Sequence, residues 1–340
     1  NTTKSKGLSF AEGKNFDENL ELYPYHSGPL DQESFKLAHL ELKKTVIKQA
    51  EKLNIKFQNN YSSFKLPVNK INNSISLLDS YTETIGNYFK KNPNSLAFNA
   101  DLLRDAGTLE VSRTSKSQFF EFGIAEQDMV SFGSGVAARG LIPWFHSFSC
   151  FLSTRSQEQI FNFCSEQRKG IFVGSLSGPI PSGPGHSHQM VRDLAIIGSM
   201  PFMLVFEPIT PLMIKEFPNF QENIKQPIFL RLANCKLSLG KYENIGIPEI
   251  SKMIEIISIT KFTEKVVIIQ GAVLFNEIIS AINKIKSKGN VSIFCAVWLN
   301  KISLDQIKRM NKKEIFIFET TTEIGDFASQ IAVLALSEGL

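Results

Sequence analysis

Apolar runs and helix-like repeats alternate along the chain from about residue 76. The runs are rich in Phe, Ile, Val and Leu, and the segments between them place apolar residues three or four positions apart. The predicted strands lie at residues 95–102, 119–123, 141–145, 171–176, 202–208 and 227–232. The predicted helices lie at residues 76–90, 125–139, 159–167 and 211–224. This alternation predicts an α/β fold with a parallel sheet that is covered by helices on both faces.

The same alternation resumes near residue 261 and predicts a second, smaller α/β domain. Its expected strands are residues 266–271, 291–297 and 314–320, with helices between them and a last helix from about 327. We expect this domain to be cut short at Leu340.

The part of the chain before residue 76 is less regular. A charged helix is predicted at residues 37–54, and a polar, Asn-rich linker follows at 56–73. Residue 1 is Asn and not Met, so we expect the chain to be processed or to be part of a longer protein.

Composition excludes several classes of function. The 340 residues carry a net charge of only +4 and their lysines are scattered, which argues against a nucleic-acid partner. No apolar run approaches the length of a membrane span, and no signal peptide is visible. The four cysteines lack metal or disulfide spacing, so free thiols in a reducing compartment, the cytoplasm, are expected.

The segment FFEFGIAEQ, residues 119–127, is the most informative part of the sequence. An aromatic strand runs into a turn at Gly123, and a helix then opens with Glu126 at a strand-to-helix junction, where α/β enzymes hold ligands. A carboxylate in the first turn of a helix is often only a favourable partner of the helix dipole. Here Gly123 allows close backbone approach, and a carboxyl shielded by aromatic residues can donate or relay a proton. Glu126 is therefore the first candidate for a catalytic residue.

A loop rich in Gly and His, GPGHSHQ at residues 183–189, follows downstream. His186 and His188 have no Cys, Asp or Glu close in sequence, so a metal site is disfavoured. Histidines are common in surface loops; the functional alternative is hydrogen bonding to a substrate or proton shuttling.

Aromatic and basic residues offer further candidates. Phe145, Phe148 and Phe151 recur at intervals of three, which is typical of core packing but also suits a ring-stacking pocket. Arg155 and Arg231 can each bind an anion or form a surface ion pair, and Arg231 stands at the end of a predicted strand. The chain has neither a P-loop nor a GxGxxG motif after a strand.

Together these segments resemble the transketolase family of thiamine diphosphate enzymes, which includes 1-deoxyxylulose-5-phosphate synthase. FEFGIAEQDMV resembles the pyrimidine-domain signature of the family, and FLSTRSQEQI is similar to the aromatic segment of split, two-subunit transketolases. GPGHSHQMVRDLAIIGSMPFM resembles the family's DGxTHQ loop and the helix after it, and FETTTEIGDFAS resembles the C-terminal domain. The resemblance covers nearly the whole chain and implies the thiamine-diphosphate-binding fold.

The resemblance divides the chain into four parts. Residues 1–40 correspond to the end of a diphosphate-binding domain, 41–75 to a helix and linker, 76–245 to the pyrimidine-binding domain, and 260–340 to the C-terminal domain. The GDG motif and later Asn that bind magnesium and diphosphate in the family are absent from the chain. We therefore expect the Mg²⁺ ligands upstream of residue 1 or on a partner chain. A homodimer or a paired diphosphate-domain subunit would complete the site.

The resemblance also implies roles for single residues around the cofactor. Glu126 corresponds to the glutamate that hydrogen-bonds N1′ of the aminopyrimidine ring and promotes its reactive tautomer. Phe148 and Phe151 correspond to the aromatic residues around that ring. The implied cofactor contacts are Glu126, Phe148, Phe151, Asp101, Leu102 and Ile124.

Substrate contacts are implied in the same way. His188 corresponds to a loop histidine that contacts an oxygen of the donor substrate, and His26 to a histidine beside the reacting centre. The resemblance therefore implies a catalytic role, with Glu126, for both histidines. Arg231 corresponds to an arginine that binds a substrate phosphate, and Arg155 is a further candidate for substrate binding.

The implied activity is transfer of a two-carbon ketol unit between sugar-type or 2-oxo substrates. Pro184 and Leu176 replace an Asp and a His of the family pattern, which leaves the donor and acceptor open. One alternative is an activity like that of 1-deoxyxylulose-5-phosphate synthase or another enzyme that decarboxylates 2-oxo acids. The other is a non-catalytic partner subunit, against which the presence of Glu126 and His188 argues.

Overall fold

The structure is a computed structural model of the chain. It describes residues 8–12, 31–55, 74–180, 185–284, 290–311 and 313–340. The chain divides into two compact units, Asn1–Lys70 and Ile71–Leu340.

The first unit contains the helix α1 (Gln32–Lys52). The carboxylate of Asp31 accepts hydrogen bonds from the backbone N–H groups of Glu33 and Ser34, which caps the helix N-terminus. The predicted helix at residues 37–54 is therefore present but begins earlier, because its cap lies before the charged repeat.

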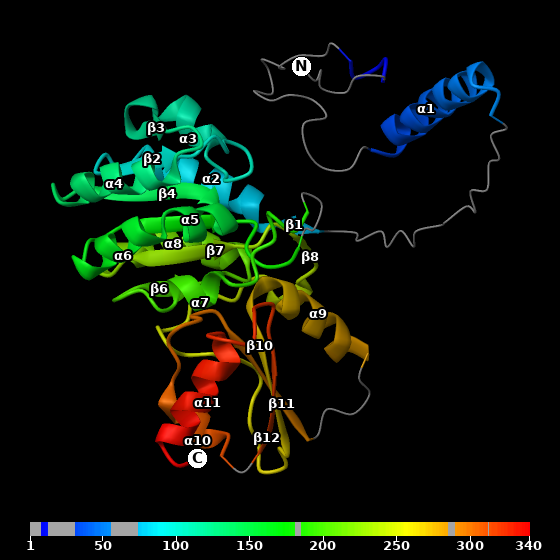
Figure 1. Ribbon diagram of the computed structural model, residues 1–340. Helices are drawn as coiled ribbons and strands as arrows, with labels where there is room; N and C mark the ends of the chain where they lie inside the picture. Colours follow the sequence, from blue (N-terminus) through cyan, green and yellow to red (C-terminus); the bar gives the residue numbers. More distant parts are fainter. Residues whose placement is uncertain (1–7, 13–30, 56–73, 181–184, 285–289, 312) are drawn as a thin grey trace. The chain divides into compact units, whose positions relative to one another are not determined.

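The second unit contains a six-stranded sheet with the order β3-β2-β4-β5-β7-β6 (Figure 1). Its strands are β2 (Ser95–Asn99), β3 (Phe119–Glu121), β4 (Ile142–Phe148), β5 (Ile171–Ser175), β6 (Leu204–Phe206) and β7 (Ile228–Leu232). Every neighbouring pair is parallel, which confirms the predicted parallel sheet.

Helices cover both faces of this sheet, as the sequence predicts. Successive residues of a strand point to opposite faces, so Trp144 packs into one core and Phe145 into the other. The Trp144 side carries α2 (Leu77–Phe89) and α8 (Pro211–Glu222). The Phe145 side carries α4 (Glu126–Ala137), α6 (Gln157–Ser165) and α7 (Asp193–Ile197).

The aromatic repeat is divided between two structures and is not one helical stripe. Phe145 lies inside β4 and belongs to the main core, whereas Phe148 ends the strand and Phe151 lies on the next helix, α5 (Ser149–Arg155). The sequence predicted a strand ending at 145 and one helix near 159–167. The structure has a longer strand and two short helices, α5 and α6.

A second, mixed sheet has the order β12-β10-β11-β9. Its strands are β9 (Ile254–Ile257), β10 (Lys265–Gln270), β11 (Val291–Ala296) and β12 (Glu314–Phe318). The strand β9 runs antiparallel to β11 and precedes residue 260, where we expected this domain to start. All four β9 residues are half-buried, so the strand leaves no period of two in the sequence.

Helices also cover both faces of the second sheet. The helix α9 (Gly271–Lys284) packs into the same core as Trp144, whereas α10 (Leu304–Arg309) and α11 (Phe327–Ser337) pack into the opposite core. The two sheets are joined by backbone hydrogen bonds between the ends of β6 and β11, including Glu207 N–H to Val297 C=O at 2.8 Å.

All four cysteines are free thiols. Cys150, Cys164 and Cys295 are buried, and Cys235 is half-buried. Burial raises the pKa of Cys150 to about 11 and those of Cys164 and Cys235 to about 12, and it raises the pKa of Cys295 well above the usual value. The thiols are therefore protonated at neutral pH.

Glu319, directly after β12, is a carboxyl group whose pKa is raised toward neutral pH. Burial, a hydrogen bond to Asp326 and the charge of Asp326 raise the pKa of Glu319 to about 7. A carboxyl group whose pKa is higher in the folded state makes folding less favourable as pH rises from about 4.5 to 7. We expect Glu319→Gln to reduce this loss of unfolding free energy, measured by urea denaturation at pH 5 and pH 8. The control Glu314→Gln changes an exposed carboxylate and should retain the wild-type difference in unfolding free energy between pH 5 and pH 8. Equal pH dependence in both variants would contradict the raised pKa of Glu319.

Candidate functional site

Glu126 is the first residue of α4 and lies at the carboxyl edge of the six-stranded sheet. Its side chain is 2% exposed, and its Oε1 accepts hydrogen bonds from Ser147 Oγ at 3.1 Å and from an Arg155 guanidinium nitrogen at 2.8 Å. The turn before it depends on Gly123, whose φ of 67° suits a residue without Cβ. The arginine and the positive end of the α4 dipole compensate the buried negative charge.

Both hydrogen bonds of Glu126 fall on the same oxygen. Among the described residues, none donates to Oε2. The carboxylate therefore retains an acceptor for a group that this part of the chain does not supply.

An aromatic cluster of Phe148, Phe151 and His188 lies next to this acid. The His188 ring makes edge contacts with Phe148 and Phe151, with centroids 5.6 and 5.1 Å apart. The guanidinium carbon of Arg155 lies 3.8 Å above the centre of the Phe151 ring. A continuous set of contacts thus runs from His188 through Phe151 and Arg155 to Glu126.

The loop that carries His188 is fixed at its end. Met190 and Gly178 exchange backbone hydrogen bonds of 3.0 and 2.9 Å. Thr322 N–H, from the segment between β12 and α11, donates to Val191 C=O at 2.7 Å. The second sheet's domain therefore supports the end of the histidine loop. His186 is exposed and takes no part in the cluster.

The remaining cofactor candidates lie at the same edge of the sheet. Asp101 is exposed and has a positive φ of 57° just after β2. Leu102 packs against a small buried cluster that includes Phe148. Ile124 is 72% exposed, although it stands between Gly123 and Glu126. This exposure leaves its side chain available to a ligand or a second chain.

Two predicted site residues are not part of this arrangement. His26 lies outside the described residues. Arg231 is 1% exposed, donates from Nε to Asp193 at 2.9 Å and is bonded to Glu207. Burial alone would lower the pKa of Arg231, but these two carboxylates outweigh it and raise the pKa. A guanidinium so enclosed is not accessible to a substrate phosphate, so we assign Arg231 a structural role and withdraw its substrate-binding role.

Sequence reasoning overlooked the polar partners of these residues. Ser147 was visible only as a polar residue between aromatic ones, and its hydrogen bond to Glu126 depends on how the end of β4 lies relative to the start of α4. Glu207 follows β6 directly, and a carboxylate at a strand end is a signal that could have identified it.

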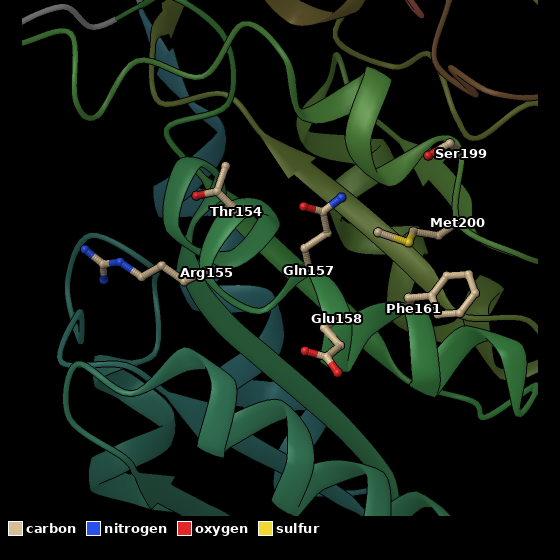
Figure 2. Close-up of a pocket in the computed structure, with 7 residues that line it drawn as sticks. All are labelled: Thr154, Arg155, Gln157, Glu158, Phe161, Ser199 and Met200. Atoms are coloured by element: carbon tan, nitrogen blue, oxygen red, sulfur yellow. The ribbon is translucent and has the colours of Figure 1, made fainter.

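A separate cavity of about 520 Å³ lies beside Arg155, on the side away from its guanidinium group (Figure 2). It is lined by Thr154, Arg155, Gln157, Glu158, Phe161, Ser199 and Met200. Figure 2 shows the Arg155 guanidinium directed away from Gln157 and Met200. The cavity and the site around Glu126 therefore share Arg155 but lie on different sides of it.

Within the described ranges, no group of three or more His, Cys, Asp or Glu residues could hold a metal ion. None of the helices found there is long and apolar enough to cross a membrane.

Comparison with known families identifies the domain that carries this site. The family described as "Transketolase, pyrimidine binding domain" matches residues 73–237. This match assigns residues 73–237 to the pyrimidine-binding domain of the transketolase family. This transketolase-type domain contains Glu126, the aromatic cluster and all six strands of the larger sheet.

Curated relatives include both complete enzymes and sections of split ones. A 1-deoxy-D-xylulose-5-phosphate synthase of Natranaerobius thermophilus is 26% identical over 76% of this chain and 41% of that protein. A putative transketolase C-terminal section of Methanocaldococcus jannaschii is 31% identical over 48% of this chain and 52% of that protein. A 6-deoxy-6-sulfo-D-fructose transketolase subunit of a Clostridium species is 28% identical over 48% of this chain and 55% of that protein. The chain spans about half the length of these curated relatives.

Solved structures show the same fold. An inactive β4 tetramer of a split-gene transketolase superposes with a TM-score of 0.67 at 21% identity, over 78% of this chain and 86% of that one. Transketolase from Campylobacter jejuni gives a TM-score of 0.63 at 18% identity, over 85% of this chain and 47% of that one. Both confirm the expected fold of a parallel sheet with helices on both faces and a second α/β domain.

The geometry of the site fits the pyrimidine end of thiamine diphosphate. An aminopyrimidine ring has an apolar face and polar ring atoms, and the site offers aromatic rings beside a carboxylate with a free acceptor oxygen. Glu126, Phe148 and Phe151 are the residues that would hold this ring.

Proposed function

We propose that this chain supplies the pyrimidine-binding half of a thiamine-diphosphate-dependent transferase of the transketolase type. It would move a two-carbon ketol unit between sugar-type or 2-oxo substrates. The observation that supports this most strongly is Glu126, a buried carboxylate whose Oε2 lacks a donor among the described residues and which adjoins an aromatic cluster.

Each residue of the site has a distinct part in this proposal. Bound thiamine diphosphate supplies the carbanion chemistry. Glu126 holds a proton-bearing ring nitrogen, while Arg155 and Ser147 fix the carboxylate in place through Oε1. Phe148 and Phe151 exclude water from this contact. His188, which contacts both phenylalanine rings, would hydrogen-bond an oxygen of the substrate.

A second chain, or another part of the same polypeptide, would supply the diphosphate half with its Mg²⁺. Apolar side chains on the surface beside Glu126 support a protein partner: Phe120, Ile124 and Phe132 are 38%, 72% and 52% exposed. Exposed aromatic and aliphatic side chains in one region are typical of an interface. The partner is either a second copy of the chain or a diphosphate-domain subunit.

A second candidate activity is that of a 1-deoxyxylulose-5-phosphate synthase. It is favoured by the relative from Natranaerobius thermophilus, whose similarity extends over 76% of this chain. An assay with pyruvate separates the two, because this activity releases CO₂ and transfer of a ketol unit does not.

Cofactor binding tests the proposal. We expect Mg²⁺ and thiamine diphosphate to stabilise the chain, together with any subunit that copurifies with it, by about 2.7 kcal/mol at about 100 times the Kd. Magnesium with pyrophosphate alone should give a smaller gain, since it cannot occupy the pyrimidine half. Phe151→Ala should raise the Kd for thiamine diphosphate about tenfold, a loss of about 1.4 kcal/mol in binding free energy.

The matched control for this titration is Phe161→Ala, which removes a half-exposed aromatic from the separate cavity. It should bind the cofactor like the wild type. Equal stabilisation of the wild type by thiamine diphosphate and by pyrophosphate would argue against a pyrimidine site.

A further inference from the structure

Glu121, the last residue of β3, joins two neighbouring strand ends. Its Oε1 accepts hydrogen bonds from the backbone N–H groups of Asp101, at 2.8 Å, and Gly123, at 2.9 Å. Its Oε2 accepts from Asn99 Nδ2 at 2.6 Å. Asn99 is itself fixed, because its Oδ1 accepts from Thr108 Oγ1 at 3.0 Å. One exposed carboxylate therefore connects the ends of β2 and β3.

The two backbone groups that bind Glu121 belong to residues in the left-handed region. Asp101 has a φ of 57° and Gly123 a φ of 67°. A non-glycine residue such as Asp101 stays in this region only where its surroundings hold it there. The Glu121 carboxylate supplies such a hold, since it bonds the N–H of the left-handed residue itself.

Both turns lead directly into the candidate site. Asp101 precedes Leu102, which packs against the cluster containing Phe148. Gly123 precedes Ile124, and α4 then begins with Glu126. A shift of either turn would move Leu102 or Ile124, which are both candidates for contact with the cofactor.

We propose that Glu121 is a positioning residue of the pyrimidine site, which fixes the two turns that carry Leu102 and Ile124. This inference rests on the proposed function for its effect on the cofactor, but the hold on the two turns does not depend on it. Glu121 touches neither the substrate nor the cofactor; it acts through the backbone of its neighbours.

The first measurement is hydrogen exchange of the whole chain in its native assembly without cofactor. Glu121→Ala should speed exchange at least tenfold in peptides containing the Asp101 and Gly123 amides and leave peptides from β7 unchanged. Glu121→Gln retains one carbonyl acceptor but turns an amide toward Asn99, so its effect should be intermediate. The control Glu83→Gln removes an exposed carboxylate from α2 and should match the wild type.

The second measurement is the concentration of thiamine diphosphate that gives half-maximal stabilisation and half-maximal turnover. Glu121→Ala should raise it about tenfold and change kcat less than threefold, since Glu126 remains in place. If Glu121 had only a structural role, Glu121→Ala would lower the melting temperature without raising the half-maximal cofactor concentration more than it changes kcat. Glu121→Gln should restore part of the affinity for thiamine diphosphate.

The outcomes separate the two proposals. Wild-type exchange at Asp101 and Gly123 in Glu121→Ala would overturn the positioning role. The positioning role would also be overturned if Glu121→Ala exchanged faster at these amides but kept wild-type affinity for the cofactor. This outcome counts only in an enzyme that Glu126→Gln inactivates, because that loss supports the proposed function. An enzyme that needs no thiamine diphosphate would overturn the proposed function and, with it, the cofactor part of this inference, whereas the exchange result would still show whether the hold exists.

Discussion

Glu126→Gln is expected to reduce turnover about 10²- to 10⁴-fold, the usual range for loss of a proton-transfer group. Gln can keep one carbonyl oxygen facing Ser147 and Arg155, so the buried contacts that fix the side chain are retained. Its amide nitrogen then occupies the Oε2 position, which can no longer accept a hydrogen bond. The chain should therefore fold normally but lose the function of the acceptor.

Steady-state assays with saturating thiamine diphosphate and Mg²⁺ measure this effect, with unfolding curves as the check on folding. The matched control is Glu158→Gln, which changes an exposed carboxylate in the separate cavity and should keep wild-type turnover. Retention of near-full activity by Glu126→Gln would remove the main support for the proposed function.

Arg231→Met is expected to have the largest effect on stability, a loss of about 3–5 kcal/mol in the free energy of unfolding. The substitution leaves Asp193 and Glu207 buried without their counter-ion, and both carboxylates are less than 5% exposed. These residues join three parts of the fold, because Asp193 accepts from Ser149 Oγ on α5 and Glu207 accepts from Ala272 N–H on α9. Urea denaturation measures the loss.

The pH dependence of this loss tests its cause. Burial raises the pKa of Glu207 even in the presence of Arg231, and without the cation the pKa must rise further. Protonation then relieves the uncompensated charge, so the destabilisation should be smaller at pH 5 than at pH 8. The control Arg168→Met breaks a surface pair with Glu166 and should cost less than about 1 kcal/mol. A similar small cost for Arg231→Met would show that the buried network contributes little.

The larger sheet could be predicted because its strands are buried on both faces. In a strand such as IFVGS at 171–175 every residue is buried, so the apolar run is continuous and its limits are clear. The half-buried β9 gave no such signal and was not predicted. Neither was the division of residues 149–165 into two helices, since their break at Ser156 carries no Gly or Pro.

The candidate site was predictable in part. The position of Glu126 at a strand-to-helix junction could be predicted from residues 119–127 alone. This segment contains the end of a strand, then a glycine turn, then the start of a helix. Contacts between distant segments carry no local signal, and the bond between Arg155 and Glu126 is one of them. Arg231 shows the same limit: its strand-end position was predicted correctly, but burial between two carboxylates depends on tertiary packing.

The protonated state of the four native thiols makes the chain a favourable background for site-directed labelling. Thiolates, not thiols, react with maleimide or iodoacetamide reagents, so the native cysteines should react slowly while the protein is folded. A cysteine introduced at the exposed Phe132 would carry a fluorophore beside the proposed interface. Its emission would then report subunit assembly without prior removal of any native cysteine.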